Sequence, residues 1–234
     1  MTLKNTPRPE WLTFDCYGTL IQWDEGLKAM VAQILRDKGD HSVDADQLIE
    51  VYDRHEHRLE QIAPYRSFRQ LSPLGLQLAL EELGLASSAE DSQRLAGAIP
   101  RMPPFPEVIE TLARLKAMGF KLCIVSNTDD DIIAGNVAQL DGHIDRVITA
   151  QQAGAYKPDP RLFDYAHQQL GVRRDQVVHI CASPTLDHTA ARDMHFRCVW
   201  IDRGTGRHLL PDYRPDAIVS TLDQVVPLFE SLGW

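Results

Sequence analysis

Four short polar stretches of this sequence, each close behind an apolar run, carry residue types that could perform a nucleophilic displacement. The polar residues in question are Asp15, Thr19, Ser126, Asn127, Lys157, Ser183 and Asp187. A carboxylate can attack carbon as a nucleophile, and a second carboxylate can activate or orient water. A lysine between two carboxylates offsets their repulsion and keeps both ionised. Taken singly, each residue is explained as well by a helix cap, a turn or a solvated side chain.

The apolar runs that precede these residues predict buried strands that alternate with amphipathic helices. The expected strands cover residues 11–14, 120–127, 144–150, 177–183, 196–203 and 216–220, and the expected helices cover 107–119, 130–140, 160–171, 185–195 and 221–232. Such alternation predicts an α/β fold, a doubly wound sheet of parallel strands joined by right-handed crossovers. Because ligands bind at the carboxyl ends of such strands, we expect the polar stretches to converge there.

Residues 24–100 break this alternation, because they contain helical patterns and no convincing strand. The expected helices are 25–39, 44–62, 73–84 and 89–99. A helical insertion directly after the first strand would lie above the strand ends as a lid. The sequence therefore predicts an α/β core domain formed by residues 1–23 and 101–234, with residues 24–100 inserted as a helical cap domain.

Composition narrows the classes of partner that the chain can have. Its 234 residues carry a net charge of −9 without a long basic cluster, which disfavours nucleic acid and anionic membranes as partners. We find no run of about 18 apolar residues and no apolar segment near residue 1, so neither a membrane span nor a signal peptide is expected. The four cysteines form no C-x-x-C pair, so they are interpreted as reduced core residues of a cytoplasmic protein rather than as zinc ligands.

With these motifs in view, nearly the whole chain resembles the haloacid dehalogenase-like (HAD) superfamily. The first motif is Asp15 to Thr19, the second is Ser126, the third is Lys157 within GAYKPDP, and the fourth is CASPTLD with Asp187. The resemblance implies a parallel sheet with an inserted cap, and a nucleophilic aspartate at position 15.

Tyr17 and Ala182 divide this superfamily. Its magnesium-dependent phosphatases resemble D-x-D in the first motif and carry a metal-binding aspartate early in the fourth. Here those positions are Tyr17 and Ala182, and the first motif resembles the D-x-Y-G-T of the L-2-haloacid dehalogenases. Mg²⁺ needs several hard oxygen ligands, so the loss of two carboxylates predicts an enzyme without a metal or other cofactor.

The resemblance implies displacement in two steps. The carboxylate of Asp15 attacks C2 of a small 2-halocarboxylate and forms an ester, and water then hydrolyses this ester to a 2-hydroxy acid of inverted configuration. Asp187 activates or orients the water, and Lys157 holds both carboxylates.

The other motif residues are expected to bind or orient. Ser126 and loop amides take the substrate carboxylate, Asn127 faces the halide, and Tyr17 lines the substrate site. Thr19 and Ser183 orient the nucleophile and its partners, although a simple helix cap explains Ser183 equally well.

Three positions depart from the dehalogenase pattern. An asparagine that places the hydrolytic water is replaced by Pro184, and an expected tyrosine is Phe163. The halide-binding cap arginine aligns near Arg54, with Arg58 and Arg66 as alternatives. A solvated helix face explains any one of these arginines at least as well.

These departures leave several functions open. The leading hypothesis is a metal-independent (S)-2-haloacid dehalogenase, expected to be a cytoplasmic homodimer that binds a small anionic carboxylate. The substrate could instead be a fluoroacid or another acid with an activated C2 bond, such as a strained azetidine. A magnesium-dependent phosphatase and a non-catalytic binding protein are the alternatives from other classes.

Overall fold

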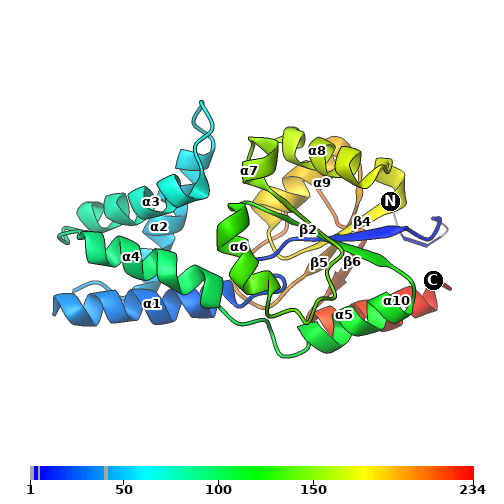
Figure 1. Cartoon of the computed structure of the whole chain (residues 1–234), viewed down its shortest axis with the longest axis horizontal. Coiled ribbons are helices and arrows are strands. Elements are labelled where there is room, and N and C mark those ends of the chain that lie inside the picture. The colour runs from blue at the N-terminus through cyan, green and yellow to red at the C-terminus, as the bar shows by residue number, and fades with distance from the viewer. Residues whose placement is uncertain (1–2, 5, 40–41) are drawn as a thin grey trace.

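The computed structural model describes residues 3–4, 6–39 and 42–234, and its centre is a parallel sheet (Figure 1). Its strands are β1 (Trp11–Phe14), β2 (Lys121–Ser126), β3 (Arg146–Thr149), β4 (Val177–Cys181), β5 (Arg197–Ile201) and β6 (Ala217–Val219). They lie in the order β3-β2-β1-β4-β5-β6, and every neighbouring pair is parallel. The predicted doubly wound α/β fold is confirmed.

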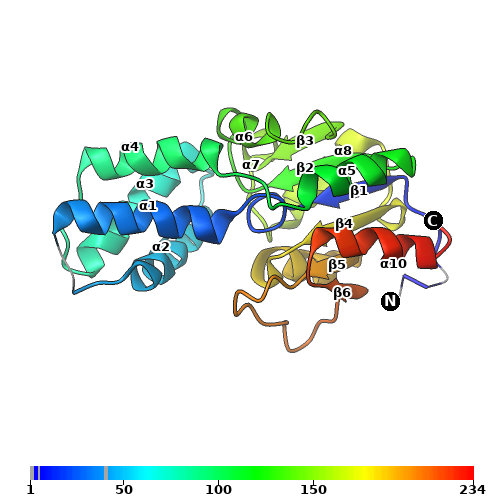
Figure 2. The same ribbon diagram turned by 90° about the horizontal axis from the view of Figure 1, so that it is seen from below.

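Helices cover both faces of this sheet (Figures 1 and 2). On one face lie α5 (Val108–Ala117) and α10 (Val225–Ser231), and on the other lie α8 (Pro160–Leu170) and α9 (Thr189–Met194). Two further helices, α6 (Asp130–Val137) and α7 (Ala150–Ala153), follow β2 and β3. The central strands β1 and β4 are apolar except for Thr13 and His179, because both of their faces are covered. The strand order reverses between β1 and β4, which is where ligands bind in such sheets.

Four helices lie together beyond the strand ends, at the left of Figure 1. They are α1 (Trp23–Lys38), α2 (Ala45–Glu60), α3 (Phe68–Glu82) and α4 (Ala89–Ala98), and the described part of residues 24–100 contains no strand. Asp44 caps α2, since its side chain accepts a hydrogen bond from the Gln47 amide. The expected start of α3 at Pro73 was wrong. Ser67 is the N-cap, and Pro73 lies inside the helix.

The chain leaves the sheet for these helices and returns through two segments that lie side by side. The Gln22 amide donates to the Pro103 carbonyl at 2.9 Å, and the Phe105 amide donates to the Leu20 carbonyl at 3.0 Å. Ile21 and Pro104 form an antiparallel bridge between them. One hydrogen-bonded pair of segments therefore connects the helical layer to the sheet.

Two expectations from the sequence concern membrane spans and the state of the cysteines. No helix in the described residues has the length and apolar character needed to cross a membrane. All four cysteines are buried free thiols, as expected for core residues. The remaining short helices are a π-helical turn over Pro184–His188 and three 3₁₀ turns over Ile99–Arg101, Arg174–Gln176 and Leu222–Gln224.

Candidate active site

The carboxyl ends of β1 and β4 bring two carboxylates onto one lysine. Asp15 follows β1 directly, and Asp187 lies in the π-helical turn after β4. The Nζ atom of Lys157 lies 2.9 Å from Asp15 Oδ1 and 2.8 Å from Asp187 Oδ1. Lys157 and Asp187 are wholly buried, and Asp15 is only 8% exposed. The convergence expected from the strand ends is therefore present in the fold.

The charges in this cluster stabilise one another. Burial alone lowers the pKa of Lys157, but the fields of Asp15 and Asp187 outweigh it and hold the pKa above the usual lysine value. Burial acts in the opposite direction on Asp187, where the charge of Lys157 and a hydrogen bond from His179 prevail and lower its pKa to about 2. At neutral pH the lysine is thus a cation and Asp187 a carboxylate.

Thr19 fixes the second oxygen of Asp15. Its hydroxyl donates to Asp15 Oδ2 at 2.7 Å and accepts a hydrogen bond from the Ala182 amide at 2.9 Å. Because Lys157 holds Oδ1, both oxygens of Asp15 are oriented from opposite sides. This arrangement matches the orienting role expected for Thr19.

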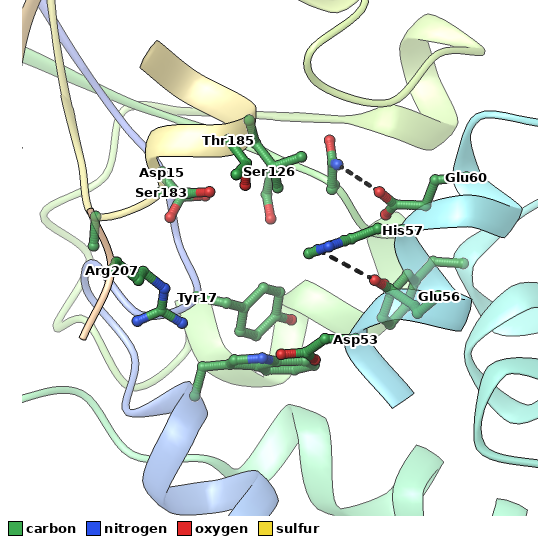
Figure 3. Close-up of a pocket in the computed structure, with 15 residues that line it drawn as sticks. Asp15, Tyr17, Asp53, Glu56, His57, Glu60, Ser126, Ser183, Thr185 and Arg207 are labelled. Carbon is green, nitrogen blue, oxygen red and sulfur yellow. Dashed lines mark hydrogen bonds and ion pairs between the residues drawn. The ribbon is translucent and has the colours of Figure 1, made fainter. Parts of the chain in front are cut away.

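Asp15 opens onto a cavity of about 140 Å³ (Figure 3). Its lining consists of Asp15, Tyr17, Trp23, Asp53, Glu56, His57, Glu60, Phe68, Ser126, Asn127, Ala182, Ser183, Thr185, Leu186 and Arg207. Asp15, Tyr17, Ser126, Asn127 and Ser183 were expected there from the sequence.

The predicted binding residues differ in the atoms that they leave free. Ser126 Oγ is buried and has no hydrogen-bond partner among the described residues. The amide of Asn127 is engaged, because its Oδ1 accepts from the Lys157 amide at 2.7 Å and its Nδ2 donates to Glu60 Oε2 at 3.1 Å. The hydroxyl of Tyr17 donates to Asn136 Oδ1 at 3.0 Å, so the ring of Tyr17 is what remains for the cavity.

The assignment of Arg54 to substrate binding is corrected by the structure. Arg54 is on the exposed face of α2, where its guanidinium lies 2.6 Å from Glu82 Oε1, and it does not line the cavity. Arg58 and Arg66 do not line it either. The arginine in the lining is Arg207, which follows β5 and binds both oxygens of Asp24 at 2.8 Å.

Sequence reasoning missed the acidic side of the cavity. Asp53, Glu56 and Glu60 stand on one face of α2, and His57 lies between the two glutamates in Figure 3. Their spacing of three and four residues places them on one helix face and was a usable signal. The expectation of a halide-binding cation pointed instead to Arg54 and Arg58, which lie on the same helix.

A second missed residue is His179 in β4. Its Nε2 atom lies 3.0 Å from Asp187 Oδ1, and its Nδ1 atom lies 2.9 Å from Thr13 Oγ1. Since Asp187 is ionised, Nε2 must carry the proton and donate. The signal was two polar residues, Thr13 and His179, within otherwise apolar strands that pair in register.

Two groups of side chains in the described residues could offer metal ligands. One is Cys181, His188 and Cys198, and the other is His179, Cys181 and Asp187. Both groups are buried, and none of their members lines the cavity. The ring of His188 packs against Trp200 and Tyr213.

Comparisons with known proteins agree with this architecture. Residues 10–194 match the family model of haloacid dehalogenase-like hydrolases. An (S)-2-haloacid dehalogenase of Pseudomonas sp. (strain YL) is 33% identical over 170 residues, 71% of this chain and 72% of that protein. (S)-2-haloacid dehalogenase 1 of Pseudomonas sp. (strain CBS-3) is 29% identical over 81% of this chain and 83% of its own.

Solved structures show the same fold. A crystal structure of a dehalogenase has a TM-score of 0.83 and 25% identity, covering 97% of this chain and 98% of that one. The L-2-haloacid dehalogenase of Xanthobacter autotrophicus with chloropropionic acid covalently bound has a TM-score of 0.80 and 20% identity, covering 95% and 98%, and supports the fold alone. The chain therefore belongs to the haloacid dehalogenase-like hydrolases and, within them, to the L-2-haloacid dehalogenase family.

Proposed function

We propose that this enzyme hydrolyses small 2-substituted carboxylic acids of the (S)-2-haloacid type through an ester on Asp15, without a metal ion. The observation that carries the proposal is the pair of carboxylates on Lys157 beneath a small cavity. The relatives named above act on (S)-2-haloacids, which gives the substrate class.

In the first step, an oxygen of Asp15 attacks C2 of the substrate and the leaving group departs from the opposite side. Thr19 and Lys157 restrict the rotation of Asp15, so the attack needs little reorganisation. The substrate carboxylate needs donors, and the free hydroxyl of Ser126 supplies one together with the amides of the loop after β4.

In the second step, water attacks the carbonyl carbon of the Asp15 ester and releases the 2-hydroxy acid. Asp187 Oδ1 is occupied by Lys157 and His179, whereas Oδ2 has no partner among the described residues. We assign Oδ2 to the water. A carboxylate with a pKa of about 2 is a weak base, so Asp187 orients the water and takes its proton only as the new bond forms.

The residues around Asp15 do not fit a magnesium site of the phosphatase kind. Ala182 has no side-chain donor at the position of a metal-binding aspartate, and the hydroxyl of Tyr17 is directed to Asn136. Chloride and bromide leave as stable anions. The reaction also involves no phosphoryl group whose charge a metal ion would have to neutralise. The derived mechanism therefore contains no metal.

We also propose that residues 24–100 act as the cap domain of this site and that the protein is a cytoplasmic homodimer. Helix α2 supplies one wall of the cavity, which supports the first point. The thiols of Cys181 and Cys198 lie 3.4 Å apart at hydrogen-bond distance and are free rather than joined in a disulfide, which supports a reducing compartment. Analytical ultracentrifugation tests the dimer.

A single turnover in H₂¹⁸O with (S)-2-chloropropionate tests the ester. EDTA-treated enzyme should incorporate ¹⁸O into Asp15, because water attacks the side-chain carbonyl rather than the substrate carbon. Asp15→Asn should give neither label nor product, whereas Asp187→Asn should accumulate a covalent adduct that intact mass spectrometry detects. Unlabelled Asp15 together with phosphatase activity that depends on added Mg²⁺ would contradict the proposal.

A further inference from the structure

The wall of the cavity opposite Asp15 is built from the carboxyl groups of α2. Figure 3 shows Glu56 and Glu60, with His57, on the side of the cavity away from Asp15 and Ser126. Glu56 is 6% exposed and Glu60 is 8% exposed. We call this pair, Glu56 and Glu60, the α2 carboxyl pair.

The α2 carboxyl pair has no cationic partner in the described residues. Glu60 accepts one hydrogen bond from Asn127, and His57 Nε2 lies 3.6 Å from Glu56 Oε2. The side chain of His57 is 45% exposed, and partial desolvation with the charge of Arg207 lowers its pKa, which weakens it as a cationic partner for Glu56. The two nearby cations are engaged elsewhere, Lys157 with Asp15 and Asp187, and Arg207 with Asp24.

Two buried carboxyl groups without a cation retain protons at neutral pH. Burial raises the pKa of Glu56 to about 8, and the charge of Asp53 adds to this effect. Burial and the neighbouring Glu56 place the pKa of Glu60 well above its usual value. The titratable and charged groups that face the pair are Asp53, His57 and Tyr52 of α2, Lys157 and Asp15 of the core, and Arg207 of the loop after β5.

The position of the pair relates it to the leaving group. In a displacement, the nucleophile and the leaving atom lie on opposite sides of the carbon, so a leaving atom attacked from Asp15 points toward α2. A chloride or bromide leaving toward α2 would lie next to carboxyl groups, and the described residues place no unpaired cation beside it. The orphaned hydroxyl of Ser126 holds the other end of the substrate, on the side of Asp15.

Building on the proposed function, we propose that the α2 carboxyl pair donates a proton or a strong hydrogen bond to the leaving atom. The site is therefore selective for 2-fluoro acids, whose leaving fluoride accepts a hydrogen bond strongly, over 2-chloro and 2-bromo acids. Glu56 and Glu60 are catalytic residues in this scheme.

The atoms balance in this scheme. As the bond from Asp15 to C2 forms, the C2–X bond breaks, its electron pair goes to X, and X takes a proton from the pair, which becomes a carboxylate. Water then adds to the ester, and Asp187 passes a proton from this water to solvent. The α2 carboxyl pair takes up a proton from solvent again. The sum is substrate plus water giving a 2-hydroxy acid and HX.

Leaving-group selectivity tests the proposal with two substrates, (S)-2-fluoropropionate and (S)-2-chloropropionate. The wild-type enzyme should process the fluoride with at least about 10-fold higher kcat/KM than the chloride. Glu56→Gln with Glu60→Gln should lower that preferred activity about 100-fold, so that the preference for the fluoride is lost. Activity on the preferred substrate should fall as the pH rises through about 8, because the donor loses its proton.

Glu50→Gln is the matched control, because Glu50 is an exposed carboxylate on the same helix. Glu60→Asp should restore part of the preferred activity if an acidic proton is what matters. Equal losses on both substrates, or a wild-type preference for chloride, would overturn the inference. Label from H₂¹⁸O in Asp15 during chloride release would then leave the proposed function standing, whereas no label with any substrate would refute both.

Discussion

At the scale of single residues, the proposed hydrolysis of the ester depends on how firmly Asp187 is held. Two donors reach its Oδ1 atom, Lys157 from one side and His179 from another. The imidazole is in turn bonded to Thr13, so a buried chain of three side chains supports the water-orienting carboxylate. Supporting hydrogen bonds of this kind fix the orientation of a catalytic group without touching the substrate. We regard His179 as a positioning residue.

Replacing His179 with leucine should slow hydrolysis of the ester more than its formation. Without the donor at Nε2, Asp187 rotates more freely and its pKa rises, so kcat should fall about 10- to 100-fold. Rapid-quench measurements should then show a burst of leaving group followed by slow acid release. His167→Leu is the control, because His167 is a buried histidine that is not part of the hydrogen-bonded series Thr13–His179–Asp187. A burst-free loss of both steps would contradict the positioning role.

At the scale of elements, the first turn of α3 is anchored to the sheet domain by Asp129. This buried carboxylate accepts the amides of Phe68 at 3.0 Å and Arg69 at 2.8 Å. The amides at a helix N-terminus attract negative charge, so the contact joins the helical layer to the loop after β2. Phe68 itself lines the cavity, so the same contact also sets one part of the substrate site.

Asp129→Ala should therefore weaken both stability and substrate binding. The buried amide of Phe68 and the partly buried amide of Arg69 lose a charged acceptor, and the free energy of unfolding should fall by about 2–3 kcal/mol. KM should rise more than kcat falls, because the reacting groups are untouched. Urea unfolding and steady-state kinetics measure the two effects. Asp131→Ala, which removes only an exposed ion pair with Arg69, should change stability by less than about 0.5 kcal/mol.

The elements also show what a sequence can and cannot predict. Apolar runs that end in polar residues placed Asp15, Lys157 and Asp187 together, because the carboxyl ends of parallel strands share one edge. Arg54 was misplaced because the face that α2 turns to the cavity depends on how the whole layer packs on the sheet. Pro73 resembled a helix start in the sequence. The first turn of α3 instead begins after Ser67, because the side chain of Asp129 accepts a hydrogen bond from the Phe68 amide. Phe68 and Asp129 lie 61 residues apart in the sequence.

At the scale of the whole molecule, buried carboxyl groups determine how stability varies with pH. Asp187 has a lowered pKa of about 2, so its stabilising contribution is present above about pH 4 and is lost as the pH falls toward 2. Asp53 and Glu56 have raised pKa values of about 7 and about 8. Their folded forms bind protons that the unfolded chain releases above about pH 4.5, so stability declines as the pH rises from there to about 8.

We accordingly expect maximal stability near pH 4–5 rather than at neutrality. The free energy of unfolding should decrease on the order of 1–3 kcal/mol between pH 5 and pH 8. Urea titrations at several pH values check this, and Glu56→Gln with Glu60→Gln should flatten the decline. Stability that rises steadily from pH 5 to pH 8 would show that these carboxyl groups are ionised in the folded state.

The paired segments that connect the helical layer to the sheet have an evolutionary consequence. Gln22 and Pro103 are hydrogen-bonded neighbours. The two ends of the inserted segment between them are therefore held together, whatever the length of that segment. Lengthening such an insertion costs little additional loop entropy. A lineage can therefore exchange or remodel the helices as a cassette while the sheet keeps Asp15, Lys157 and Asp187 in place. The nucleophile and the opposite wall of the cavity lie in separate parts of the fold, so substitutions in the helices can change the substrate without rebuilding the nucleophile.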